Sequence, residues 1–134
     1  MSGTFHPAKR QTLHILGTGP DHDPNRGHLY VVLTNKCDKG LHLLVPICSK
    51  RHGSDGTCLL GTGDHGFLKN DSYVSYHHAA EWDSAVIAER IKNGDITFRG
   101  LLDEKVFALV AGGVENSLFT KPKIKSYYQN NKLK

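Results

Sequence analysis

The chain has 134 residues, of which 38% are hydrophobic and 22% charged, as expected for one globular domain. Its longest apolar runs, residues 43–48 and 106–111, are far shorter than the roughly 20 residues that a transmembrane helix needs. Residues 1–10 lack the apolar stretch of a secretory signal. We therefore expect a cytoplasmic protein without a membrane segment.

The cysteine pattern argues against a disulfide or zinc framework, and the positive charge is concentrated at the C-terminus. Cys37, Cys48 and Cys58 form no CxxC pair and are odd in number, so we expect reduced thiols and no structural zinc site. The net charge is +4, but the last 14 residues hold five lysines and no acid. This basic tail, residues 121–134, is suited to contact phosphate or an acidic partner, or to keep the chain soluble.

Alternating and continuous apolar segments predict about five β-strands, which are residues 11–16, 28–34, 41–47, 57–60 and 71–77. The second and third segments are separated by the turn-forming sequence NKCDKG, and we expect them to form an antiparallel hairpin. Before the hairpin, residues 17–27 are rich in Gly, Pro, Asp and Asn. We expect a long loop there, of the kind that often has a function.

Helical patterns follow the strands. Residues 81–93 have helical composition and end at Gly94, a favourable residue after a helix. Asp103 is a good N-cap for a second helix, and a third helix can start at Pro122. The pattern predicts an α+β fold with a small, strongly bent antiparallel sheet. We expect one domain, comprising a strand region (11–78), C-terminal helices (81–120) and the basic tail.

Three segments resemble the MazF/PemK-like toxin family. Residues 28–34 read HLYVVLT, where family members typically have Arg-Pro-x-Val-Val-Leu-Ser, and residues 45–49 read VPICS, where a family strand ends in Pro-Ile-Thr-Ser. Residues 71–76, DSYVSY, correspond to a family strand near Val-Asp-Gln-Val-Arg-Ser. The resemblance covers residues 26–116. It implies an SH3-like barrel, a homodimer, a cognate antitoxin and cofactor-free, metal-independent cleavage of single-stranded RNA.

The chain departs from this family at the positions that carry its chemistry. The family's catalytic arginine falls on His28, and its catalytic threonine falls on Cys48, with Ser49 adjacent. The turn that contains His65 has no counterpart in the family pattern. The chemistry is therefore either rebuilt with histidines or lost.

Histidines suit metal-free RNA cleavage, which needs a base at the 2′-hydroxyl and an acid at the leaving oxygen. We expect His28 and His65 to be these two groups, with Ser49 donating a hydrogen bond to a phosphate oxygen. The expected phosphate- and RNA-binding residues are Cys48, Lys50, Arg51, Tyr73 and Tyr76. Tyr73 and Tyr76 point to opposite faces of their strand, so at most one is expected to stack on a base.

Two other functions remain open at the sequence level. Loss of the family arginine favours a non-catalytic module of the same barrel class, which binds nucleic acid or protein. A metal-dependent hydrolase is the third hypothesis, with Asp64, His65 and either His77 or His78 as ligands. The plainer interpretation of the pair His77-His78 is a structural or solvent-facing role.

Overall fold

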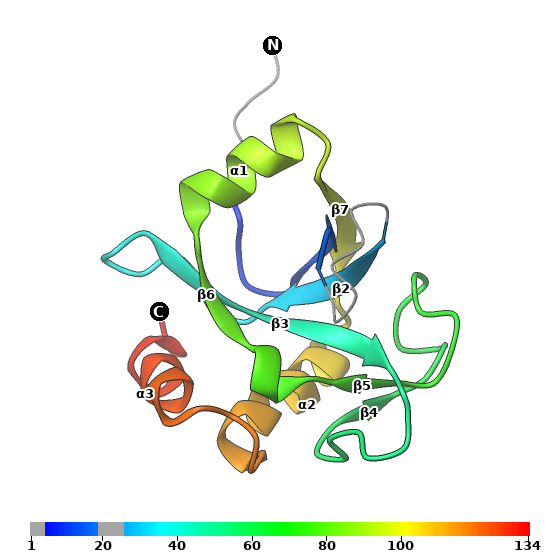
Figure 1. Ribbon diagram of the computed structural model, residues 1–134. Helices are drawn as coiled ribbons and strands as arrows, with labels where there is room; N and C mark the ends of the chain where they lie inside the picture. Colours follow the sequence, from blue (N-terminus) through cyan, green and yellow to red (C-terminus); the bar gives the residue numbers. More distant parts are fainter. Residues whose placement is uncertain (1–4, 19–25) are drawn as a thin grey trace.

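Seven antiparallel strands form one sheet in the computed structural model, which describes residues 5–18 and 26–134 (Figure 1). Their order is β4-β5-β3-β2-β1-β7, and β6 pairs with β3. The strands are β1 (Gln11–Leu16), β2 (Gly27–Val32), β3 (Leu41–Ser49), β4 (Leu59–Leu60), β5 (Ser72–Val74), β6 (Ala80–Asp83) and β7 (Ile96–Leu101).

The sheet bends where the long strand β3 changes its partner. The first half of β3 pairs with β6 and its second half with β5, while β2 runs along its other edge. Within the described ranges, the terminal strands β4 and β7 are not paired with each other, so the sheet does not close. The expected α+β fold with a small, strongly bent antiparallel sheet is confirmed.

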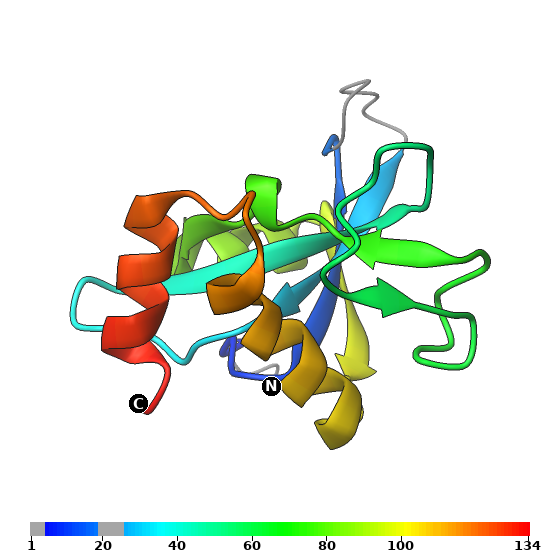
Figure 2. The ribbon, with the colours of Figure 1, turned by 90° about the horizontal axis from the view of Figure 1, so that it is seen from below.

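Both faces of the sheet are covered by helices. Helices α2 (Glu104–Asn116) and α3 (Pro122–Asn131) cover one face, and α1 (Ser84–Lys92) packs against the other (Figures 1 and 2). In β2, Leu29 and Val31 enter the α2–α3 side, whereas Tyr30 and Val32 enter the α1 side. Burial on both faces explains the continuous apolar runs of β2 and β3.

The second helix begins as the sequence predicts, but two other boundaries differ. The Asp103 carboxylate accepts hydrogen bonds from the backbone N–H groups of Lys105 and Val106 and so caps α2. The prediction of a helix over residues 81–93 is wrong at its start, because Glu81 lies in β6 opposite Leu43. The strand predicted over residues 71–77 ends early, and Tyr76–His78 forms a short 3-10 helix, η1.

The sheet also extends beyond the region predicted for it. The patterns did not predict β7, which pairs with β1 and adds an edge to the sheet after α1. The basic segment at the C-terminus forms α3, whose Ile124 and Tyr128 are buried in the α2–α3 side. No helix among the described residues is both long and apolar enough to cross a membrane.

Candidate active site

A group of polar and aromatic side chains shares the α1 side where β2, β3 and β5 meet. His28 lies opposite Ile15, Tyr30 opposite Pro46, and Cys48 opposite Tyr73. The N–H of Ser75 donates to the Pro46 carbonyl oxygen at 2.9 Å and continues this ladder. Because alternate strand residues face the same side, one face collects these side chains. We call it the β2–β3–β5 face, defined by His28, Tyr30, Cys48, Tyr73, Ser75 and His78.

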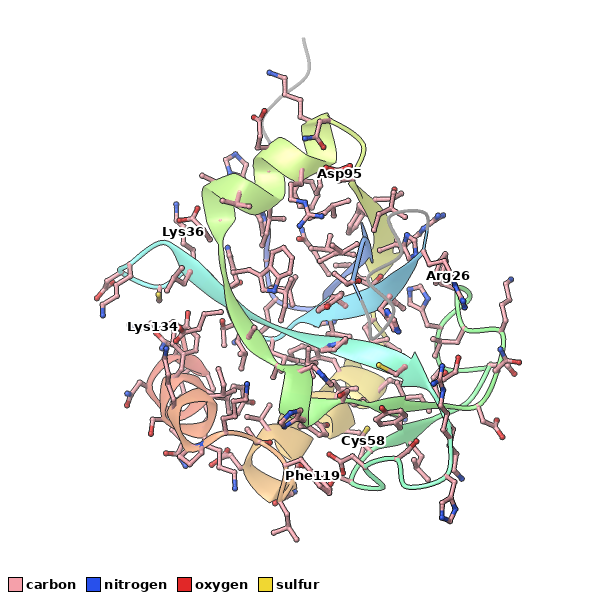
Figure 3. The ribbon with its side chains drawn as sticks, viewed as in Figure 1. Arg26, Lys36, Cys58, Asp95, Phe119 and Lys134 are labelled. Atoms are coloured by element: carbon pink, nitrogen blue, oxygen red, sulfur yellow. The ribbon has the colours of Figure 1, made fainter. Side chains whose placement is uncertain are left out.

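The ring of His28 is half-buried and held by the backbone. Its Nδ1 lies 3.2 Å from the carbonyl oxygen of Thr18, and its backbone N–H donates to the Thr18 hydroxyl at 3.3 Å. A carbonyl oxygen only accepts, so Nδ1 carries the proton and Nε2 is left for proton exchange. Arg26 lies two residues before His28, immediately before β2 (Figure 3).

Cys48 and the two tyrosines stay protonated near neutral pH. Burial raises the pKa of the Cys48 thiol, although the Tyr73 hydroxyl and the Arg51 charge partly oppose this. Burial likewise raises the pKa of Tyr30 and of Tyr73. A thiol with a raised pKa is a poor nucleophile, but neutral S–H and O–H groups can donate hydrogen bonds to an oxyanion.

His78 joins this face through Ser75. The Ser75 hydroxyl lies 2.8 Å from His78 Nδ1, and Ser75 itself is buried whereas His78 is exposed. Burial lowers the pKa of His78, and the charges of His77, Lys121 and His28 lower it further. Pro46 pairs with Tyr30 of β2 and accepts the Ser75 N–H, so Ser75 lies across β3 from the strand that carries His28. Sequence patterns missed this pairing, since a Ser and a His three residues apart meet here only because the chain turns into η1.

His65 lies on the other face of the sheet, so the structure does not bring it together with His28. Its Nε2 is 3.0 Å from both the Thr12 hydroxyl and the Arg99 carbonyl oxygen, and its Nδ1 accepts the N–H of Phe67 at 2.9 Å. Thr12 pairs with Val31, which belongs to the α2–α3 side. Both ring nitrogens are occupied, and the ring ties its turn to β1 and β7.

The remaining predicted residues divide between the two faces and a neighbouring pocket. Ser49 pairs with Ser72, one residue after Cys48, so its side chain points away from the β2–β3–β5 face. It lines an open pocket together with Lys50, Arg51, His52, Asn70 and Asp71. Tyr73 is half-buried, whereas Tyr76 has no exposed surface and its hydroxyl donates to the Val110 carbonyl oxygen at 2.6 Å. Tyr76 therefore offers no surface to an RNA base.

Two of the residues proposed as metal ligands, Asp64 and His65, are already engaged elsewhere. The Asp64 carboxylate accepts the N–H of Gly61 at 2.6 Å, and both ring nitrogens of His65 have partners. Within residues 5–18 and 26–134, no three His, Cys, Asp or Glu side chains lie together in a group that could hold a metal ion.

Comparison with known proteins finds similarity in structure alone. No protein-family model and no curated protein matches the sequence. Among solved structures, a chain of MazE-MazF (Form-II) from Deinococcus radiodurans matches with a TM-score of 0.55 and 16% identity, over 84% of this chain and 94% of that chain. Form-III of the same complex matches with a TM-score of 0.53 and 16% identity, over 84% and 95%. The chain has a MazF-like fold.

The positions that the sequence resemblance singles out can be located in this fold. The resemblance implies that the family's catalytic arginine and threonine positions fall on His28 and Cys48. Both lie in the strands that form the β2–β3–β5 face, and Tyr73 stands directly opposite Cys48. At 16% identity the similarity establishes the fold, and the chemistry must be argued from the side chains present.

Proposed function

We propose that the protein is the toxin of a toxin–antitoxin pair and that it cleaves single-stranded RNA on the β2–β3–β5 face. One observation carries this function. On a MazF-like fold, the strands that the resemblance assigns to catalysis hold a proton-transfer group, His28, beside two hydrogen-bond donors, Cys48 and Tyr73.

These groups suit transesterification within the RNA. The 2′-oxygen forms a bond to phosphorus while the bond from phosphorus to the 5′-oxygen breaks, leaving a 2′,3′-cyclic phosphate and a 5′-hydroxyl. His28 exchanges a proton through Nε2, and the Cys48 and Tyr73 hydrogens stabilise the charged phosphorane. Lys50 and Arg51, with Ser49, line the adjacent pocket and are suited to hold the flanking phosphates. His65 has a structural role in this proposal.

The first test is cleavage of single-stranded RNA by the purified chain. We expect cleavage in the presence of EDTA, with a 2′,3′-cyclic phosphate on the upstream fragment detected by mass spectrometry. His28→Ala should lower the rate by about 100- to 10,000-fold. His6→Ala, which removes an exposed histidine of the N-terminal segment, is the matched control and should leave it unchanged.

The alternatives give different results. Cleavage that stops in EDTA or leaves a 5′-phosphate downstream would replace this function with metal-dependent hydrolysis. RNA binding without cleavage would identify a non-catalytic module of the same fold.

We also propose a cognate antitoxin and a homodimer as partners. MazF is found with MazE in the two matched crystal structures. Expression of this chain alone should therefore arrest bacterial growth, and His28→Ala should relieve the arrest. Light scattering of the purified chain measures whether the particle has twice the mass of the 14.8 kDa protomer.

A further inference from the structure

We propose that His78 is the second proton-transfer group of this site. It acts as the general base on the RNA 2′-hydroxyl, while His28 acts as the general acid on the 5′-oxygen. This inference rests on the proposed RNA cleavage and assigns its two proton transfers.

The geometry at Ser75 positions the ring of His78. Ser75 is buried, and its N–H donates a hydrogen bond to the Pro46 carbonyl oxygen. Its hydroxyl lies 2.8 Å from His78 Nδ1. Within the described part of the chain, His78 Nε2 makes no hydrogen bond, so this nitrogen is free to meet a substrate. A buried hydroxyl that holds Nδ1 fixes the ring orientation while the exposed side of the ring faces solvent. Ser75 is thus a positioning residue.

The surroundings of the two histidines separate their roles. Burial favours the neutral form of His78, and so do the positive charges of His77 on its own element, Lys121 before α3 and His28 on β2. A neutral imidazole can accept the 2′-hydroxyl proton. His28 donates Nδ1–H to the Thr18 carbonyl oxygen, a hydrogen bond that persists when Nε2 is protonated, so its imidazolium is suited to donate a proton.

The proton balance of the reaction follows. His78 Nε2 takes the proton of the 2′-hydroxyl as the oxygen–phosphorus bond forms. The bond between phosphorus and the 5′-oxygen breaks, and His28 Nε2 gives its proton to that oxygen. Exchange with water then restores neutral His78 and protonated His28.

An RNA with sulfur in place of the bridging 5′-oxygen tests this division of roles. A thiolate leaves without protonation, so only the general base remains necessary. We expect His28→Ala to cleave this substrate within about tenfold of the wild-type rate, although it cleaves the oxygen substrate about 100- to 10,000-fold more slowly. His78→Ala and His78→Gln should be defective on both substrates to a similar extent.

Results that differ from these expectations would contradict either the RNA cleavage, the role of His78, or the assignment of base and acid. If the wild-type chain cleaves neither substrate, the proposed RNA cleavage fails and this inference fails with it. If the wild type cleaves but His78→Ala cleaves the oxygen substrate within threefold of its rate, only the role of His78 fails. Rescue of His78→Ala by sulfur would reverse the two roles. Thermal unfolding of each variant checks that a slow variant is folded.

The pH profile separates chemistry from a structural role. Activity should fall with acid as His78 becomes protonated. His77→Ala removes a neighbouring positive charge and should therefore raise the pKa of His78. The acidic limb of the pH–rate profile should move to higher pH, and the maximal rate should be retained. Ser75→Ala should lower kcat more than it raises KM and should also move this limb. A Ser75→Ala variant with an unchanged limb and kcat would contradict the positioning role.

Discussion

The three cysteines differ in acidity and exposure, which makes them reporters of the local structure. For Cys37, burial alone raises the thiol pKa, but the Tyr127 hydroxyl and the backbone amides of the turn outweigh burial and lower it. Burial raises the pKa of both Cys48 and Cys58, and Cys58 is the more buried of the two, with only 7% of its surface exposed. Because the thiolate is the reactive form, iodoacetamide should modify Cys37 first, then Cys48 and last Cys58. Peptide mass spectrometry measures this order, and early modification of Cys58 would contradict it.

Individual site residues could be predicted from the sequence only where a motif carries them. The resemblance directs attention to His28 and Cys48, and the structure puts both in strands of the same face. Only the residue type of His65 suggests a catalytic role, and the path of its turn puts the ring on the opposite face of the sheet. His78 has no sequence signature, because its contact with Ser75 requires a 3-10 turn after a three-residue strand.

Two adjacent glycines in α2 have opposite requirements. A Cβ at Gly113 would overlap the ring and hydroxyl of Tyr76, whereas a Cβ at Gly112 meets open space. Gly113→Ala should destabilise the protein by about 1–3 kcal/mol, because the buried tyrosine must shift. Gly112→Ala is the matched control and should stabilise it by about 0.5–1 kcal/mol through helix propensity. Urea unfolding gives both values, and equal effects of the two substitutions would show that Tyr76 does not pack against α2.

Elements with clear periodicity were predicted, and elements defined by long-range pairing were not. The pattern of β1 gives the observed bounds, Gln11–Leu16, because Leu13 and Ile15 alternate along one face of the strand and both enter the apolar cluster of the α1 side. In β7 only Ile96 is buried, and its central residues are exposed at the edge of the sheet, so no alternation marks it. Residues of β6 have helical composition, but pairing with β3 overrides this propensity.

At the scale of the whole molecule, the basic C-terminal segment is part of the folded body. The ammonium of Lys9 donates to the carbonyl oxygen of Lys132 at 2.8 Å, and the Asn35 amide donates to that of Lys134 at 2.9 Å. Lys134 thus lies beside the β2–β3 turn that contains Lys36 (Figure 3). These contacts hold the C-terminal segment against Lys9 and the β2–β3 turn, and Lys132 also pairs with Glu115 of α2 at 3.0 Å.

A second long-range connection makes stability depend on pH. The Asp55 carboxylate, before β4, accepts hydrogen bonds from the Ser117 hydroxyl at 2.7 Å and the Thr57 hydroxyl at 2.6 Å. Burial by itself raises the pKa of Asp55, but these hydrogen bonds outweigh it and lower the pKa. A folded-state pKa below the unfolded one stabilises the protein above the unfolded pKa, and this stability is lost as the pH falls through the folded pKa.

Asp55→Asn should therefore cost about 1–3 kcal/mol at pH 7, because it removes the charged acceptor of the buried Ser117 hydroxyl and of the Thr57 hydroxyl. The cost should shrink in acid, where the wild-type carboxylate is itself protonated, beginning below an unfolded pKa of about 3.9. Urea unfolding of both proteins at pH 7 and at pH 3 measures the difference. A cost that grows in acid would mean that burial dominates at Asp55, and that its charge does not help to hold the end of α2 against the sheet.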